Sequence, residues 1–256
     1  MSILELTKIE FKKVKRSKIF PLLFIPPMLV VISGVYSLSM YMTPEYTNAW
    51  KAMFIQSALL FGYYLLPFTM VVVCVMISNR EIQNNGILKM LALPIEKGKL
   101  ALTKFFVLLT FLMIELSVFF ITFIVAGVIA TTVMNVTETI PVMYLLSWTL
   151  KLFLTTIPSI SLMWAITVFF EKPLLSIGLN LLLIIPGVLV ANTPVWFCYP
   201  YCYSGYMVSD ALHTITTQGA EISSSLQLFP FIPCAIILTC ISLVAAVKQF
   251  GRKETK

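Results

Sequence analysis

Few residues in this sequence combine the types and the spacing that enzyme or metal chemistry requires. His213 is the single histidine and has no cysteine cluster or carboxylate pair beside it, so we expect no metal site. A glycine-rich phosphate loop ending in Lys-Ser or Lys-Thr is missing, so the chain is not expected to bind ATP itself. Cys198 and Cys202 are close enough in sequence to form a disulfide, which the pattern leaves open. The sequence therefore predicts no catalytic, cofactor-binding or metal-binding residues in this chain.

The composition is that of a protein embedded in a lipid bilayer. Of the 256 residues, 59% are hydrophobic and 11% are charged, against about 45–50% and about 25% in soluble domains. The net charge of +7 comes from lysines and arginines at the boundaries of apolar runs. Lipid head groups and membrane topology explain basic residues at such places, so nucleic acid is not an expected partner. We predict an all-α integral membrane protein.

Six apolar segments are long enough to cross the hydrocarbon core, which takes roughly 20 helical residues. They are residues 19–42, 52–78, 105–134, 145–170, 173–192 and 226–247, within a single transmembrane domain over residues 1–256. Residues 193–225 form a predicted outer loop that begins with many aromatic side chains. An interfacial belt or a re-entrant helix is the favoured interpretation of that loop, and direct substrate contact is the alternative.

The basic residues predict the orientation of the chain. Sixteen of the eighteen lysines and arginines lie before the first span, between the second and third, between the fourth and fifth, or after the sixth. Only Lys51 and Lys151 lie on the other side of the membrane. The positive-inside rule therefore places both termini and residues 79–104 in the cytoplasm.

Residues 1–18 are predicted to form an interfacial helix. On a helical wheel the basic residues share one face, and the apolar residues lie towards the other. The basic face carries Lys8, Lys12, Lys15 and Arg16. The apolar side carries Ile3, Leu6, Phe11 and Val14. Such a helix can lie in the inner interface with its apolar side in the acyl boundary. The alternative is a basic tail that only sets the topology.

The cytoplasmic loop at 79–104 carries apolar side chains where a simple linker would be polar. Ile87, Leu88 and Leu91 lie between Gly86 and Pro94. A short apolar helix of this kind suits a groove on a partner protein. Lying against the membrane is the alternative way to cover these side chains.

This loop resembles the coupling element of the membrane subunits of type-2 ATP-binding-cassette (ABC) exporters. In that family an acidic residue precedes a glycine, then a leucine-rich turn, then a proline with a basic residue close behind. The positions that fit here are Glu81, Gly86, Leu88, Leu91, Pro94, Ile95, Lys97 and Lys104. We assign coupling to an ATPase to Glu81, Gly86, Ile87, Leu88, Leu91, Pro94 and Lys97. The size and the first two spans look most like permeases of lantibiotic-immunity and bacitracin-resistance transporters.

The resemblance implies six spans, an N-terminal interfacial helix, a cytoplasmic coupling helix and a bacterial plasma-membrane location. It also implies two copies of a separate ATPase that bind Mg-ATP, a second permease subunit of the same or a related chain, and amphipathic antimicrobial peptides as substrates. Two other classes stay open from the residues alone: an ion-gradient-driven secondary transporter or channel, and a non-transporting membrane scaffold. Secondary transporters often show inverted repeats and several intramembrane ionisable groups. Here we find no repeat and one such acid.

Glu115 is that acid, and it lies well inside the third predicted span. Ionisable residues within a membrane usually face a bundle interior or a cavity, because a charge in contact with lipid is costly. One hypothesis is that Glu115 contacts a cationic substrate or a partner subunit within the membrane. The alternative is a neutral glutamic acid that hydrogen-bonds a neighbouring helix.

The predicted orientation can be tested by labelling single cysteines in a cysteine-free background. Because residue 89 is expected in the cytoplasm, Lys89→Cys should react with a membrane-impermeant maleimide only after the cells are opened. Thr216→Cys, in the predicted outer loop, should react in intact cells and serves as the control. Labelling of residue 89 in intact cells would reverse the predicted topology.

Overall fold

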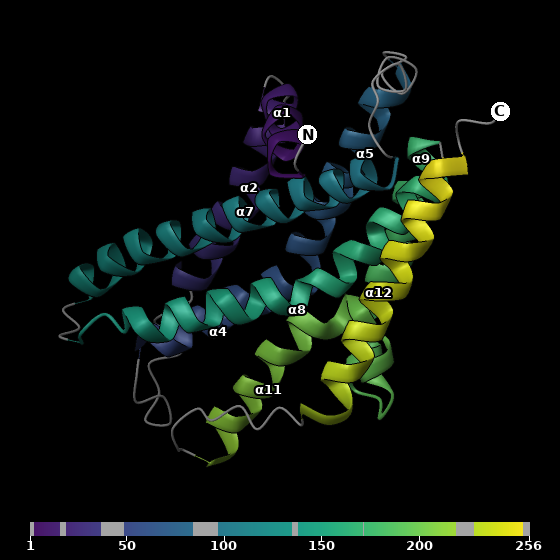
Figure 1. Cartoon of the computed structure of the whole chain (residues 1–256). Helices are drawn as coiled ribbons and strands as arrows, with labels where there is room; N and C mark the ends of the chain where they lie inside the picture. Colours follow the sequence, from purple (N-terminus) through teal and green to yellow (C-terminus); the bar gives the residue numbers. More distant parts are fainter. Residues whose placement is uncertain are drawn as a thin grey trace.

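The computed structural model describes residues 3–15, 19–36, 49–83, 97–134, 138–170, 172–218 and 228–252. Six helical segments in this part of the chain are long and apolar enough to cross a membrane, which confirms the predicted number. They are Ile19–Tyr36, Ala49–Arg80, Gly98–Val133, Val142–Phe169, Pro173–Ala191 and Phe229–Phe250. The N-terminal helix and the end of the last helix lie at the same end of the bundle, as an even number of spans requires (Figure 1).

The helices follow one another with few breaks. Their bounds are α1 Ile3–Lys15, α2 Ile19–Tyr36, α4 Ala49–Leu60, α5 Leu66–Gln83, α7 Lys97–Val133, α8 Val142–Phe169, α9 Pro173–Ile184, α10 Gly187–Ala191, α11 Tyr203–Gln218 and α12 Leu228–Arg252. A π-helical turn, η1 (Phe61–Leu65), joins α4 to α5, and two 3-10 turns, η2 (Trp196–Cys198) and η3 (Pro200–Cys202), precede α11.

The ends of the predicted cytoplasmic loop are helical. Helix α5 continues to Gln83, beyond the predicted end of the second span at residue 78. Helix α7 begins at Lys97 rather than at Phe105. Helices α5 and α7 thus extend into the predicted cytoplasmic segment at 79–104, and its remaining residues, 84–96, lie outside the described part of the chain.

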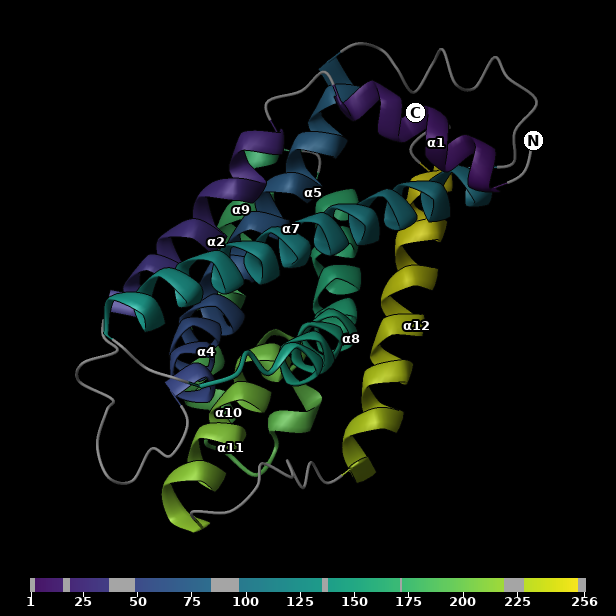
Figure 2. The same ribbon diagram turned by 90° about the vertical axis from the view of Figure 1, so that its left-hand side faces the viewer.

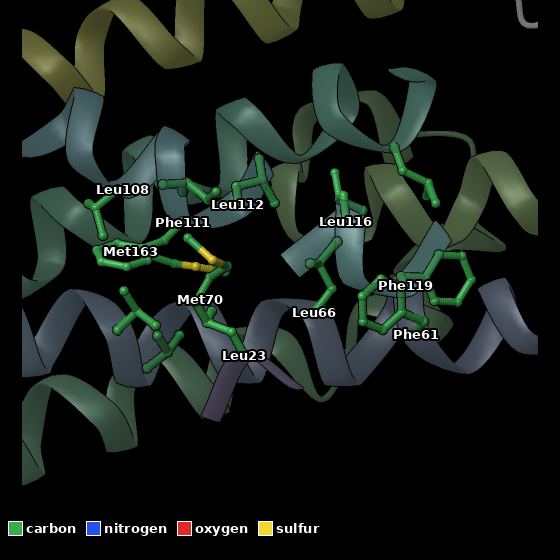
Figure 3. Packing of buried hydrophobic residues seen from close by; sticks show 14 of the residues in the cluster. Leu23, Phe61, Leu66, Met70, Leu108, Phe111, Leu112, Leu116, Phe119 and Met163 are labelled. Carbon is green, nitrogen blue, oxygen red and sulfur yellow. The ribbon is translucent and has the colours of Figure 1, made fainter. Parts of the chain in front are cut away.

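The hydrophobic core lies along one face of α7. Buried side chains recur every three or four residues on this helix and pack against η1 and α5, as Figure 3 shows. The labelled α7 side chains are Leu108, Phe111, Leu112, Leu116 and Phe119, and those opposite include Phe61, Leu66 and Met70. The rings of Phe61 and Phe119 stack with centroids 4.6 Å apart. The π-helical turn is thus fixed by direct packing on α7.

Helix α11 packs deep against the second span, so residues 203–218 of the predicted outer loop form a helix, in agreement with the re-entrant interpretation. The Ser204 hydroxyl donates a hydrogen bond to the backbone oxygen of Gly62 at 2.7 Å. Gly205 lies flat against the Tyr63 ring, where an added Cβ would be 2.2 Å from a ring carbon. Because Gly62 lies roughly 20 Å along the helix from Ala49, α11 begins deep inside the outer half of the bundle, as a re-entrant helix would.

Tyrosine hydroxyls connect the segment of the two 3-10 turns to α9 and the beginning of α11 to η2. Tyr199 donates to the backbone oxygen of Leu183, and Tyr203 donates to that of Phe197. The hydroxyl of Tyr201, which is almost fully buried, donates to the amide oxygen of Asn180 at 2.7 Å. Non-helical backbone at membrane depth is tolerated only where protein groups or water supply such partners. These bonds therefore let the chain turn back within the outer half of the bundle.

Candidate functional site

Helix α1 packs across the beginning of α7, beside the end of α12, as Figure 2 shows. The ring of Phe11 stacks on Phe111 with centroids 5.4 Å apart and meets the edge of Phe20 at 6.3 Å. Leu6 is also buried. The predicted N-terminal helix therefore forms, and α7 and α2 cover part of the apolar face that was expected to lie in lipid.

A buried ion pair connects α1 to α7. The Nζ atom of Lys104 lies 3.7 Å from one carboxylate oxygen of Glu10, and the Nζ atom of Lys13 lies 2.6 Å from the other. The side chain of Lys104 is fully enclosed and that of Glu10 is 9% exposed, whereas that of Lys13 is 48% exposed. An enclosed ammonium group needs a counter-charge, because removal from water is otherwise very costly. Glu10 supplies that charge and so fixes where α1 lies.

The end of α5 is connected to α1 by a separate contact. Arg80 donates a hydrogen bond from its guanidinium group to the backbone oxygen of Lys13 at 2.8 Å. The last carbonyl groups of a helix lack partners within the helix and attract cations. Helix α1 thus contacts both helices that flank residues 84–96. We call Glu10, Lys13, Arg80 and Lys104 the coupling cluster.

The structure places only the ends of the predicted coupling element. Gly86, Ile87, Leu88, Leu91 and Pro94 lie outside the described residues. Their role in coupling stays a prediction.

The two flanking residues of that element belong to helices. Glu81 lies in the last turn of α5, directly after Arg80, and Lys97 is the first residue of α7. Within the coupling cluster, Arg80 lies in the last turn of α5, and Lys104 lies about two turns after the beginning of α7.

Sequence reasoning missed the partner of Lys104. Glu10 follows Ile3 by seven residues and Leu6 by four, which places an acid on the apolar face of α1. An acidic residue on the apolar side of a basic helix indicates a buried cation opposite it, and this signal was available. From the sequence, Lys104 served only to predict the orientation of the chain and to support the resemblance to the coupling element.

Glu115 is enclosed between α7 and α5 rather than open to a substrate. Its side chain is fully buried, and Thr69 is a polar neighbour. The Thr69 hydroxyl, however, donates to the backbone oxygen of Leu65 at 2.8 Å. Neither carboxyl oxygen of Glu115 has a hydrogen-bond partner of normal geometry among the described residues. In this conformation Glu115 cannot reach a peptide, so the hypothesis of substrate contact would require α7 and α5 to separate.

Among the described residues, six helices that are long and apolar enough to cross a membrane define a polytopic membrane protein. The profile of the family described as "ABC-2 family transporter protein" matches residues 6–187, more than half of the chain. The chain therefore belongs to the ABC-2 family of transporter proteins. No individual curated protein matches it by sequence.

Family membership gives the chain its class and location. It is a multi-pass membrane protein, consistent with the bacterial plasma membrane, and the permease subunit of an ABC transporter. Members of this class are not themselves catalytic and work with an ATPase subunit. The family match therefore assigns the chain to the ABC transporter permeases and not to the secondary transporters or the membrane scaffolds.

The ion pair should show strong coupling between its partners. Glu10→Gln removes the carboxylate that lies beside the enclosed Lys104 ammonium and should destabilise the purified permease by about 3–5 kcal/mol. Adding Lys104→Met should restore most of the loss, because the enclosed ammonium group is then removed. Melting temperatures in mild detergent measure this, with Glu5→Gln on the exposed side of α1 as control. Additive losses in the double variant would show that the pair does not hold α1.

Glu115 should behave as a packing residue. Glu115→Gln keeps the shape and should leave membrane abundance and transport near wild type. Glu115→Ala leaves a cavity in the core and should lower stability by about 2–5 kcal/mol, as other large-to-small changes do. Met113→Ala, on the exposed side of the same helix, is the matched truncation and should change little. Loss of transport by the glutamine variant at normal abundance would instead support a functional charge.

Proposed function

We propose that this chain is the permease subunit of an exporter that expels amphipathic antimicrobial peptides, of the lantibiotic or bacitracin kind, from the membrane. The observation that carries the transport role is the coupling cluster, which connects α1 to both helices that flank residues 84–96. The substrate class is supported by the likeness of the size and the first two spans to lantibiotic-immunity and bacitracin-resistance permeases.

In the proposed assembly, two ATPase subunits with bound Mg-ATP contact residues 84–96, and a second permease subunit completes the transporter. Closure of the ATPases would displace this segment. Because Arg80 and Glu10 connect the ends of α5 and α7 to α1, the three helices would move together. A displacement of residues 84–96 would then shift the inner ends of α1, α5 and α7 together, instead of changing only the conformation of that segment.

The second span offers a route from the inner end to the outer end. Helix α5 runs from Gln83 back to the π-helical turn at Phe61–Leu65, against which α11 packs. Turns of this kind are frequent at functional sites and allow local rearrangement of a helix. A shift of α5 would therefore reach α11 and the 3-10 turns, which lie in the outer half of the bundle.

The outer end presents an aromatic surface suited to amphipathic molecules. Trp196 stacks on Tyr206 with centroids 4.0 Å apart and on Phe231 at 5.5 Å. Tryptophan and tyrosine gather at membrane interfaces, where amphipathic peptides also lie. A peptide released from the outer leaflet would leave past this surface.

The coupling role can be tested by placing charges in the apolar turn. Replacing both Leu88 and Leu91 by aspartate removes apolar burial of roughly 1.5–3 kcal/mol for each side chain. We expect the variant to insert normally but to lose the co-purifying ATPase and resistance to a panel of lantibiotics and bacitracin.

The matched control replaces Asn84 and Asn85 by aspartate, which adds the same charge to the same segment without removing apolar groups. It should keep the ATPase and the resistance. Full ATPase association in the leucine variant would contradict the coupling role. A wild type that recruits the ATPase but gives no resistance to any peptide would instead refute the substrate class alone.

A further inference from the structure

A pocket of about 690 Å³ lies between the middle of α8 and the first half of α12. Its lining includes Lys151, Leu154 and Pro158 from α8 and Phe231, Ala235 and Cys240 from α12. Figure 2 shows α12 beside α8 at the edge of the bundle. The volume is within the range of small-molecule sites, about 300–1,000 Å³.

Lys151 is the charged residue among those that line this pocket. The two lining threonines, Thr155 and Thr239, donate their hydroxyls to the backbone oxygens of Lys151 and Ala235, at 2.9 and 2.7 Å. Their hydrogen atoms are thus used within their own helices. The pocket therefore combines apolar walls with one ammonium group.

The ammonium group lies at the outer end of the pocket. The Nζ atom of Lys151 is 4.7 Å from the ring centroid of Trp148, which is three residues nearer the outer end of α8. The side chain thus extends towards the predicted outer surface, as snorkelling lysines do. Among the α12 residues that line the pocket, Phe231 lies nearest the outer end of the helix, and it stacks on Trp196. Such aromatic groups mark the head-group level of a membrane.

The other end of the pocket lies within the hydrocarbon depth. Cys240 is nine residues beyond Phe231 on α12, or roughly 13 Å deeper along the helix. The pocket is thus an apolar slot with a cation at its outer end, and it extends inward along the helices.

We propose that this pocket binds one anionic phospholipid of the outer leaflet, with an acyl chain in the slot and the phosphate at Lys151. Charge complementarity favours this occupant, because Lys151 attracts an anionic head group and repels a cationic peptide. The acyl chain matches the apolar walls. The site is separate from the coupling cluster, and the inference does not depend on the proposed peptide substrate.

The head-group preference can be measured by native mass spectrometry of the purified permease in mild detergent. The probes are phosphatidylglycerol and phosphatidylcholine with identical acyl chains. The wild type should retain one phosphatidylglycerol at least fivefold more often than phosphatidylcholine. Lys151→Gln should abolish this preference, whereas Lys51→Gln should keep it. Lys51 is the matched control because it is the other predicted outer lysine and lies near the Tyr144 ring, at 5.6 Å from its centroid.

A second pair of variants tests the slot itself. Cys240→Trp places a large side chain in the pocket and should lower retention of both lipids several-fold. Ile237→Trp adds the same group at an exposed position of α12 that does not line the pocket, and it should retain lipid like the wild type. Both positions have exposed side chains, so loss of folding is not the expected cause of a difference.

Three results would overturn the proposal. The first is equal retention of the two lipids by the wild type, which indicates general solvation by lipid. The second is a preference that survives Lys151→Gln. The third is efficient cross-linking of Cys240 between two permease copies in a background without other cysteines, which would show that a second copy covers the pocket.

Discussion

The ion pair between Glu10 and Lys104 is the interaction on which the inner end of the bundle depends. Amphipathic helices usually lie at a membrane surface with some freedom to slide, because burial of apolar area does not depend on direction. An enclosed ammonium group is different, since it requires its counter-charge at one place. Glu10 therefore fixes both the position and the rotation of α1. Once α1 is fixed, its last turn presents the Lys13 backbone oxygen to Arg80, and the inner ends of three helices become one unit.

A second constraint acts in the outer half, where backbone polar groups must find partners away from water. Tyr199, Tyr201 and Tyr203 supply hydroxyl donors around the 3-10 turns. Ser204 supplies another to the π-helical turn, and Gly205 lets the two backbones approach. The second span thus connects two fixed regions: the coupling cluster at its inner end and α11 at its middle. A helix held in this way transmits a displacement better than one that is surrounded only by lipid.

Hydropathy predicted the six spans and the N-terminal helix because long apolar runs and amphipathic periodicity are local properties of a sequence. Hydropathy does not give the ends of helices, because it reports where the chain leaves the membrane, whereas α7 already begins at Lys97. At Tyr203–Gln218 the serines, threonines and Asp210 left a belt, a re-entrant helix and substrate contact open, and the structure shows a helix that neighbouring elements largely bury. The ion pair could not be found from composition, since its partners lie 94 residues apart in sequence and meet only through the packing of α1 on α7.

Glu115 and Lys151 show why an ionisable residue in a spanning helix cannot be interpreted from its type alone. Both lie within apolar helices, and intramembrane charge makes each a candidate for function. Glu115 is enclosed by core side chains, so its environment is set by the protein and offers no room for a ligand in this conformation. Lys151 lines a pocket between two helices and extends towards Trp148, so its charge lies beside a space that a molecule could occupy. The difference comes from what packs around each residue: core side chains enclose the acid, whereas the lysine borders a pocket.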